Sequence, residues 1–228
     1  MSYSAVIFDV DGTLVDTNDG HIDAWRRAFA SMGYDVGAER IRPEVGKGGD
    51  NLVPSIIGEE ADARDGAELR KRDTEEFLAT AKRLTFTLFP GAVELMDELL
   101  ARELRTAIAT SSKTEQIDQL MLSVGVDLRA HVHEVVTGDD AESTKPAPDL
   151  VEVAVAKLGL AAADCVMIGD TPHDGEACRQ AGVAFIGVLC GGNSAEALRD
   201  AGAISVWLHP ADILAHLDSV LRVAAPSR

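Results

Sequence analysis

Short, continuous apolar runs recur along the chain, and each ends at a polar or glycine-containing segment. Such runs are typical of strands buried on both faces of a parallel sheet. They predict strands at residues 5–8, 106–109, 135–136, 165–168, 184–188 and 204–208. Between several of these strands, apolar residues return at helical spacing, as in Ile117, Leu120, Met121 and Val124, and in Val151, Ala154, Val155 and Leu158. The alternation favours a Rossmann-like parallel α/β sheet with helices on both faces.

One long stretch, residues 17–88, interrupts this alternation and contains no convincing strand. Residues 59–83 are rich in charges of both signs, which favours exposed helices over a disordered insertion. A helical stripe precedes them at Ile22, Trp25 and Phe29. We therefore expect residues 17–88 to form an inserted α-helical unit, and residues 1–16 and 89–228 to form one α/β core domain.

Composition narrows the classes of partner. Hydrophobic residues make up 46% of the 228 residues, enough for a sizeable core, and the formal net charge of -17 argues against nucleic acid and anionic membranes as partners. No apolar run approaches the ~20 residues that span a bilayer. The first residues lead straight into an apolar strand, so we expect no signal peptide. The three cysteines form no metal-binding pattern, and their odd number fits a reducing compartment, so we expect a cytoplasmic protein.

Carboxylates follow two of the predicted strands. Asp9 and Asp11 come directly after the first strand, and Asp170 follows another, with Asp174 one turn later. Aspartate is common in turns and at helix starts, so each alone could be structural. Because the carboxyl ends of parallel strands meet at one edge of the sheet, the four are expected to converge. Carboxylates as close as Asp9 and Asp11 repel unless one is protonated or a cation lies between them, and an oxygen-binding cation such as Mg²⁺ would relieve the repulsion.

Three further polar residues lie where a phosphate could be held. Thr110 and Ser111 end a third strand just before a helix, where hydroxyls and backbone N–H groups hold phosphoryl oxygens or simply cap the helix. Lys145 follows a polar loop and precedes Pro146. It could neutralise a carboxylate and a phosphate, or be an ordinary surface lysine.

Together these residues resemble the haloacid dehalogenase superfamily. Its four motifs are matched in order by Asp9-Val10-Asp11-Gly12-Thr13, by Thr110-Ser111, by Lys145-Pro146 and by Gly169-Asp170-Thr171-Pro172-His173-Asp174. The resemblance covers the whole core. The insert at residues 17–88 is similar to the helical cap of the phosphoglycolate phosphatase and β-phosphoglucomutase branch.

The resemblance implies a Mg²⁺-dependent phosphatase that works through an aspartyl-phosphate. Asp9 would be the nucleophile and a metal ligand. Asp11 would bind the metal through its backbone carbonyl, while its side chain acts as general acid and base. Thr110 and Ser111 would hold the phosphoryl group, and Lys145 would neutralise its charge and that of Asp9. These roles suit phosphoryl transfer, which depends mainly on positioning and charge neutralisation.

The fourth motif completes the implied metal site. Asp170 would bind Mg²⁺ directly, and Asp174 would orient a metal-bound water or Lys145. The acid at Asp11 points to phosphate esters, since the dehalogenase and phosphonatase branches lack it. The Gly169-Asp170 pair favours hydrolysis over the mutase alternative, whose members tend to carry Glu-Asp.

The insert is expected to choose the substrate, a small phosphorylated metabolite of the phosphoglycolate or sugar-phosphate type. Its glycine-rich loop offers Lys47, Asp50 and Asn51 as candidate contacts, although an ordinary exposed turn explains the loop equally well. Lys47 could engage a second anionic group. Hinges are expected near residues 16–19 and 86–91. A phospho-acceptor signalling domain without turnover remains as an alternative from another class, and either a monomer or a homodimer is compatible with the sequence.

Overall fold

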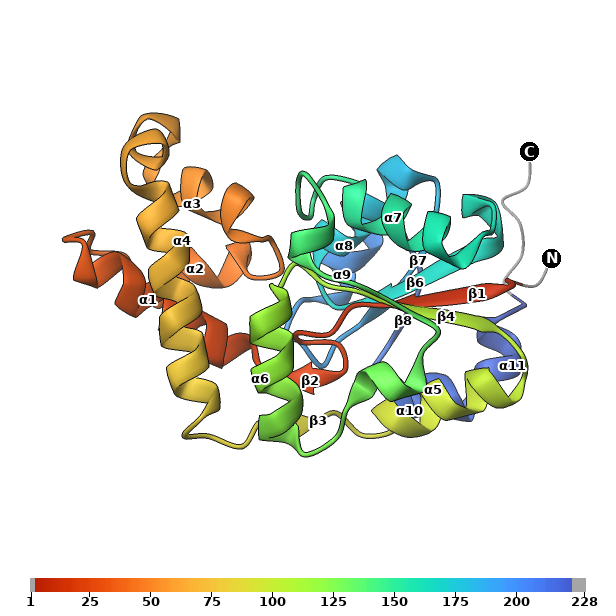
Figure 1. The fold of residues 1–228 in the computed structure, drawn as a ribbon. Coiled ribbons are helices and arrows are strands. Elements are labelled where there is room, and N and C mark those ends of the chain that lie inside the picture. Colours follow the sequence, from red (N-terminus) through yellow and green to blue (C-terminus); the bar gives the residue numbers. More distant parts are fainter. Residues whose placement is uncertain (1–2, 223–228) are drawn as a thin grey trace.

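A sheet of six parallel strands, in the order β5-β4-β1-β6-β7-β8, forms the centre of the larger part of the molecule (Figure 1). The computed structural model describes residues 3–222. The strands are β1 (Ala5–Phe8), β4 (Arg105–Ala109), β5 (Glu134–Val136), β6 (Cys165–Gly169), β7 (Ala184–Val188) and β8 (Ala203–Trp207). Each predicted strand is present to within one residue at either end, and the predicted fold class is confirmed.

Both faces of the central strands are buried, which explains why these strands read as continuous apolar runs. Val6 and Phe8 of β1 face one hydrophobic cluster, whereas Ala5 and Ile7 face another. The first cluster packs under α5 (Ala92–Ala101), α6 (Thr114–Val124), α10 (Pro210–Ala215) and α11 (Leu217–Val220). The second packs under α7 (Asp149–Leu158), α8 (Pro172–Ala181) and α9 (Ala195–Asp200).

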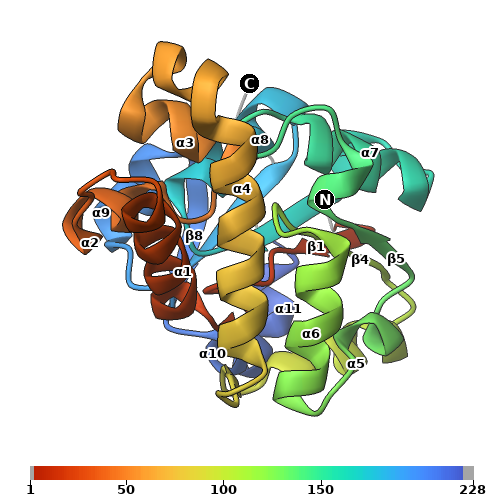
Figure 2. The ribbon, with the colours of Figure 1, turned by 60° about the vertical axis from the view of Figure 1, so that its left-hand side comes forward.

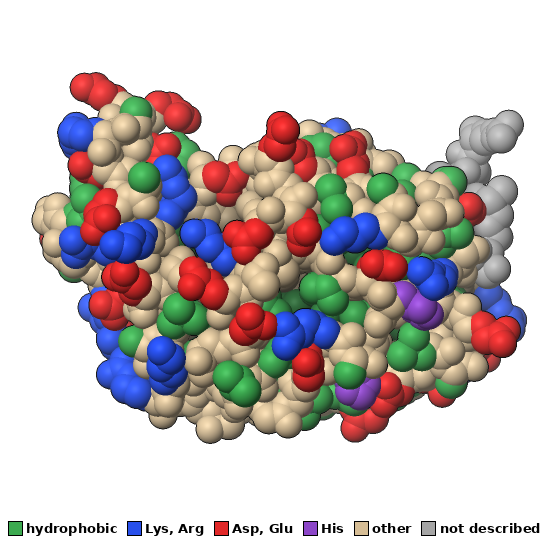
Figure 3. All heavy atoms as spheres, viewed as in Figure 1, with side chains coloured by type: hydrophobic (Ala, Val, Ile, Leu, Met, Phe, Trp, Pro, Cys, Tyr) green, Lys and Arg blue, Asp and Glu red, His purple; other side chains and the backbone are tan. Residues whose placement is uncertain are grey.

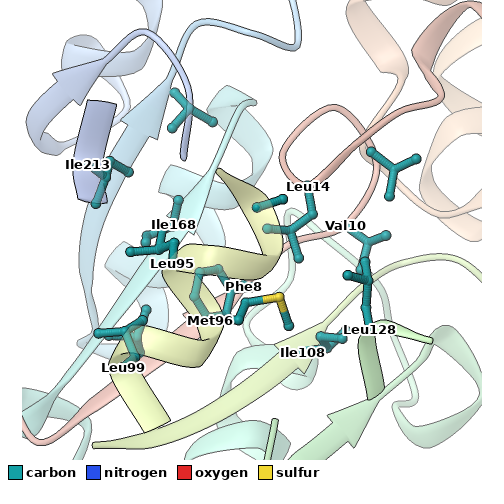
Figure 4. Packing of buried hydrophobic residues seen from close by; sticks show 14 of the residues in the cluster. Phe8, Val10, Leu14, Leu95, Met96, Leu99, Ile108, Leu128, Ile168 and Ile213 are labelled. Carbon is teal, nitrogen blue, oxygen red and sulfur yellow. The ribbon is translucent and has the colours of Figure 1, made fainter. Parts of the chain in front are cut away.

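The first cluster is densely filled where α5 crosses the central strands. Figure 4 shows Phe8 between the sheet and the α5 residues Leu95, Met96 and Leu99, all of them fully buried. Burial of each such side chain contributes about 1.5–3 kcal/mol relative to exposure, so this layer holds the central strands rigidly.

Short 3₁₀ turns complete the connections: η1 (Arg42–Glu44), η2 (Leu128–His131), η3 (Gly138–Asp140) and η4 (Ala162–Asp164).

Four helices form a separate unit on one side of the sheet, drawn in red to yellow in Figure 1. They are α1 (Asn18–Ser31), α2 (Ala38–Ile41), α3 (Gly49–Ile57) and α4 (Glu59–Ala81). We call residues 17–88 the cap and the remainder the core. The cap has its own hydrophobic cluster, which includes Trp25, Phe29, Leu52 and Leu69. This cluster explains the helical stripe read from the sequence.

Two short strands join the cap to the core. Strand β2 (Val15–Asp16) pairs antiparallel with β3 (Thr87–Leu88), at the two ends of the inserted segment. Neither strand was predicted, because two residues carry no periodicity and the pair exists only once the ends of the insert meet. The pairing lies where the sequence suggested hinges.

Helix α4 is the charged stretch of the sequence, and it lies between α1 and α6 (Figure 2). Its buried stripe contains Leu69, Asp73 and Phe77, spaced four residues apart. Phe77 reaches the cluster beneath the sheet, so the cap and core share apolar contact there. On the face in Figure 3, acidic and basic side chains are interspersed over cap and core alike. No helix among residues 3–222 is long and apolar enough to cross a membrane.

Candidate active site

The predicted acidic residues gather at the carboxyl edge of the sheet. Asp9 follows β1 and Asp170 follows β6, and these two strands are neighbours. From β1 the chain builds the sheet outward through β4 and β5, and from β6 it builds outward in the opposite direction. The two aspartates therefore flank the topological switch point, where open α/β sheets bind their ligands.

A fully buried lysine ties two of the carboxylates together. Lys145 Nζ lies 2.6 Å from Asp9 Oδ1 and 2.7 Å from Asp174 Oδ1. Burial alone would lower the pKa of Lys145, but the carboxylates of Asp174 and Asp9 outweigh it and raise that pKa above its usual range. The lysine is therefore charged, and the surface alternative considered for it does not describe its position.

Asp9, Asp170 and Asp174 form a cluster suited to a cation. One carboxylate oxygen of each lies within 4.8 Å of the others, and all three side chains are buried. Asp174 Oδ1 has no directed hydrogen bond despite its closeness to Lys145, so it keeps capacity for a further donor or ligand. Oxygen donors in this number suit Mg²⁺.

The single positive charge of Lys145 does not balance the three carboxylates of the cluster. Burial raises the pKa of Asp9 to about 7, even though Lys145 opposes the rise. Burial also raises the pKa of Asp170 well above its usual range, and the charges of Asp9 and Asp174 add to this effect. Thr13 Oγ1 donates to Asp170 Oδ1 at 3.1 Å, and Asn18 Nδ2 donates to its Oδ2 at 3.3 Å. A divalent cation would remove the remaining repulsion, so the residues present fit Mg²⁺.

Asp11 points to different partners. His21 Nε2 lies 3.0 Å from Asp11 Oδ1, Thr17 Oγ1 donates to the same oxygen at 2.7 Å, and Ser112 Oγ donates to Oδ2 at 2.7 Å. Burial opposes ionisation, yet the His21 charge and these hydrogen bonds hold the pKa of Asp11 far below its usual range. The pKa of His21 is raised by Asp11 against the effect of burial. The side chain of Asp11 thus links the core to the first cap helix and stays outside the three-carboxylate cluster.

The predicted phosphate-binding hydroxyls lie beside Asp11. Thr110 Oγ1 donates to Asp11 Oδ2 at 3.4 Å and accepts from the backbone N–H of Ser112 at 3.1 Å. Ser111 instead donates its hydroxyl to the carbonyl of Gly46 in the cap, at 3.1 Å. Helix α6 begins just beyond, at Thr114. Thr110 is therefore buried at the carboxyl edge of the sheet, which we call the rim. Ser111 connects the core to the cap.

The three candidate cap residues all make contacts within the protein. Lys47 Nζ forms an ion pair with Glu44 and donates to Ser55 Oγ at 3.0 Å. Asp50 accepts from the backbone N–H of Thr144 at 2.9 Å and also binds the Thr144 hydroxyl. Asn51 Nδ2 donates to the carbonyl of Thr144 at 2.9 Å. Among the three, only Lys47 lines the cleft above Asp9.

Close approach of the cap loop to the core depends on two of its glycines. A Cβ on Gly48 would lie 2.3 Å from Thr144 Oγ1, to which the Gly48 N–H donates at 2.9 Å. Gly46 has a φ of +100°, and a Cβ there would lie 2.7 Å from the Thr171 methyl group. The glycine-rich loop is thus shaped to lie against the two loops that carry Lys145 and Asp170.

A cleft lies between the rim and the cap. Its core wall includes Asp9, Asp11 and Thr110, and its cap wall includes Trp25 and the unpredicted Asp73. A second hollow of about 580 Å³ adjoins it and shares Trp25, Asp73 and Gln116 of α6.

Two residues that line the cleft, Asp73 and His21, were not among the candidate site residues named from the sequence. Asp73 occupies a core position of the α4 stripe, four residues from both Leu69 and Phe77, and an acid at such a position was the available signal. His21 stacks on Phe77 with a ring separation of 4.1 Å, so it does pack, but it also lines the cleft and binds Asp11.

The sheet, the inserted helices and the acidic rim at the switch point define the class: a hydrolase of phosphate esters. The chain belongs to the haloacid dehalogenase-like hydrolase family, whose model matches residues 6–188. The family resemblance read from the four motifs is confirmed.

Curated relatives cover nearly the whole chain. A phosphoglycolate phosphatase of Yersinia pestis is 30% identical over 213 residues, which are 92% of this chain and 90% of that protein. A phosphorylated carbohydrates phosphatase of Thermotoga maritima is 31% identical over 222 residues, 95% of this chain and 99% of that protein. Among solved structures, a hydrolase from Pseudomonas syringae superposes with a TM-score of 0.85 at 29% identity, covering 96% of this chain and 99% of that one.

Proposed function

We propose that the protein is a Mg²⁺-dependent phosphatase that hydrolyses a small phosphorylated metabolite through a phosphate ester on Asp9. The observation that carries the proposal is the buried Asp9–Lys145–Asp174 arrangement beside Asp170 at the switch point. A nucleophilic carboxylate must approach an anionic phosphate. The geometry offers a fixed ammonium on one Asp9 oxygen and a cation-binding cluster beside it, which reduces the repulsion.

The residues divide the reaction between them. A carboxylate oxygen of Asp9 forms a bond to phosphorus while the ester P–O bond to the leaving oxygen breaks. Lys145 neutralises the negative charge of Asp9 and of the phosphoryl group. The Thr110 hydroxyl donates a hydrogen bond to a phosphoryl oxygen. The proton for the leaving oxygen resides on the hydrogen-bonded Asp11–His21 pair and is delivered by Asp11. A water then forms a bond to phosphorus as it gives a proton to Asp11, the P–O bond to Asp9 breaks, and inorganic phosphate leaves with the Asp9 carboxylate restored.

Asp9 and Asp170 would hold the metal ion, with the backbone carbonyl of Asp11 as a further ligand. Asp174, already 2.7 Å from Lys145, would position that lysine. When bound, Mg²⁺ neutralises the charge that gathers on the phosphoryl oxygens and on Asp9. Residues 17–88 would act as a cap domain that moves about β2 and β3 to admit substrate and exclude water. We place the enzyme in the cytoplasm, where phosphorylated metabolites occur.

The test is phosphate release from p-nitrophenyl phosphate and from a panel of phosphorylated metabolites, with and without Mg²⁺. Wild-type protein should release phosphate over many turnovers, and a chelator should stop this reversibly. Asp9→Asn keeps the shape of the side chain but removes the nucleophile, so turnover should fall by more than about 10³-fold while the thermal unfolding temperature stays close to wild type. An Asp9→Asn protein that retains activity would refute the assignment.

The same assay separates the alternatives left open by the sequence. A phospho-acceptor signalling domain would take up no more than one phosphate per chain and release none catalytically. A mutase would convert a hexose 1-phosphate to its isomer faster than it releases inorganic phosphate. Hydrolysis that continues undiminished in metal-free buffer would rule out the carboxylate–cation site.

A further inference from the structure

Asp73 of α4 is a carboxylate placed where the proposed reaction does not need one. Its side chain is only 5% exposed, and its Oδ1 atom has no hydrogen-bond partner within the described chain. The residue lines both the cleft above Asp9 and the adjoining hollow. A buried carboxylate oxygen without a partner costs free energy of folding, so a ligand that donates a hydrogen bond to it would recover that cost.

The groups around Asp73 favour a neutral hydroxylated ligand. Trp25 lines both hollows with it and offers an aromatic surface to the C–H groups of a sugar or polyol. Gln116 of α6 lines the same two hollows; its Oε1 accepts from the Lys113 backbone N–H at 2.9 Å, so its Nε2 amide group is the one that can donate to a hydroxyl. A Cβ on Gly49 would lie 2.7 Å from Arg70 Cγ and 3.0 Å from the Trp25 ring, so glycine at that position lets the backbone pack closely against both side chains. Sites that bind polyols combine an apolar surface with polar groups that form hydrogen bonds to hydroxyls.

The same groups disfavour a substrate with a second anion close to the ester. Among the residues that the structure describes, two cations close to Asp73 are already paired, Lys47 with Glu44 and Arg70 with Asp62, the latter at 2.6 Å. His21 is engaged by Asp11. Lys113 lines only the outer hollow. A carboxylate beside the leaving oxygen would therefore face Asp73 with little compensation, which argues against the second anionic group considered for Lys47.

We infer that Asp73, together with Trp25 and Gln116, forms a subsite for the hydroxyl groups of the leaving group, so that the substrate is a sugar or polyol phosphate without a neighbouring second anion. The inference rests on the proposed phosphatase function, which it makes more specific. In this subsite Asp73 accepts a hydrogen bond from a substrate hydroxyl, and the hydrocarbon face of the same molecule lies on Trp25.

The experiment compares esters that differ only in these groups. Values of kcat/KM are measured for glycerol 3-phosphate against propyl phosphate, for sorbitol 6-phosphate against hexyl phosphate, and for 3-phosphoglycerate. Wild-type enzyme should prefer the hydroxylated member of at least one pair by about 30-fold or more, since a site built for a hydroxyl rejects the analogue without one. It should also prefer glycerol 3-phosphate to 3-phosphoglycerate.

Two variants at Asp73 then test the residue. Asp73→Leu should bring the ratio within the preferred pair down to about threefold or less, because its side chain accepts no hydrogen bond. Asp73→Asn, of nearly the same shape, should raise kcat/KM for 3-phosphoglycerate relative to glycerol 3-phosphate by about fivefold or more, because it removes the repelling charge. Glu75→Gln makes the same charge change at an exposed site on the same helix and should leave every ratio unchanged.

The outcomes separate the two proposals. If no ester, p-nitrophenyl phosphate included, releases phosphate with Mg²⁺, the phosphatase function itself fails. If esters are hydrolysed but alkyl and polyol phosphates react equally well, or folded Asp73→Leu keeps the wild-type ratio, the subsite is wrong. Thermal unfolding checks that Asp73→Leu is folded. Should it unfold, Asp73→Asn decides the question, and an unchanged 3-phosphoglycerate ratio overturns the inference.

Discussion

The rim of the sheet and the cap loop both carry polar residues that the sequence marked as functional, but the two regions use them differently. On the rim, Asp9, Lys145 and Asp174 contact one another across three separate segments of the core. In the cap, Asp50 and Asn51 lie in the first turn of α3, just after the glycine-rich loop, and contact Thr144, the core residue next to Lys145. The rim residues assemble a chemical site, whereas these two cap residues hold the cap against it.

The difference has a structural cause. Each rim residue lies at or soon after a strand whose position is set by the packed sheet, so a motif at a strand end implies a place in space. The cap loop belongs to a helical unit with its own hydrophobic cluster, and it meets the core mainly through polar contacts. A polar side chain in this loop can point toward the core or toward the substrate. The residue type alone does not tell which of the two it faces.

Removal of the rim lysine should have the largest effect. Lys145→Met takes away the only protein cation within the Asp9–Asp170–Asp174 cluster of the described chain and leaves the buried carboxylates opposed. We expect kcat for p-nitrophenyl phosphate to fall by more than about 10³-fold, and metal-free protein to lose about 3–5 kcal/mol of unfolding free energy in urea. Lys71→Met, at an exposed lysine, is the control. Activity above one tenth of wild type would contradict the role of the rim lysine.

Asp73 should affect stability in a pH-dependent manner. Burial raises its pKa from 3.8 to about 7, although His21 and Lys113 oppose the rise. Because the folded pKa is the higher one, the contribution of Asp73 to stability is complete below pH 4 and is lost as pH rises through 7. Asp73→Asn removes this loss, so its gain in unfolding free energy over wild type should grow from near zero at pH 4 to at most roughly 4 kcal/mol at pH 8.

Urea unfolding of both proteins in metal-free buffer at pH 4, 6 and 8 measures the difference. Glu75→Gln, exposed on the same helix, should show no comparable trend. A gain that shrinks with rising pH would mean that the Asp73 carboxylate is stabilised when ionised, and the account of its burial would be wrong.

The smallest expected effect concerns the contact between cap and core. Asp50→Ala removes the acceptor for the Thr144 N–H and hydroxyl, so we expect kcat/KM to fall by about three- to tenfold, by a similar factor for every substrate. A substrate-contacting residue would instead affect some substrates and spare others. Asp35→Ala, exposed elsewhere in the cap, should have no effect. A loss confined to one substrate class would return Asp50 to the substrate-binding role first considered.

Much of the core could be predicted because its signals are local. The run Ala5–Phe8 is apolar on both faces, and both faces are buried, so the sequence indicates a central strand directly. The short β2–β3 pair carried no such signal, since it depends on the two ends of the insert meeting. Asp73 was missed because a charged helix offers many acids, and its spacing from Leu69 and Phe77 was the one sequence signal of its burial.

Strand periodicity and motif order are local properties of the chain, so they were enough to predict the family, the sheet with its inserted helices, and the acids at the strand ends. Three features became visible only in the folded molecule: Asp11 turns to His21 and Thr17, Asp50 and Asn51 bind Thr144, and Asp73 faces the cleft. These choices depend on how the helical unit packs against the sheet. That packing arises from contacts between residues distant in sequence, which no local pattern records.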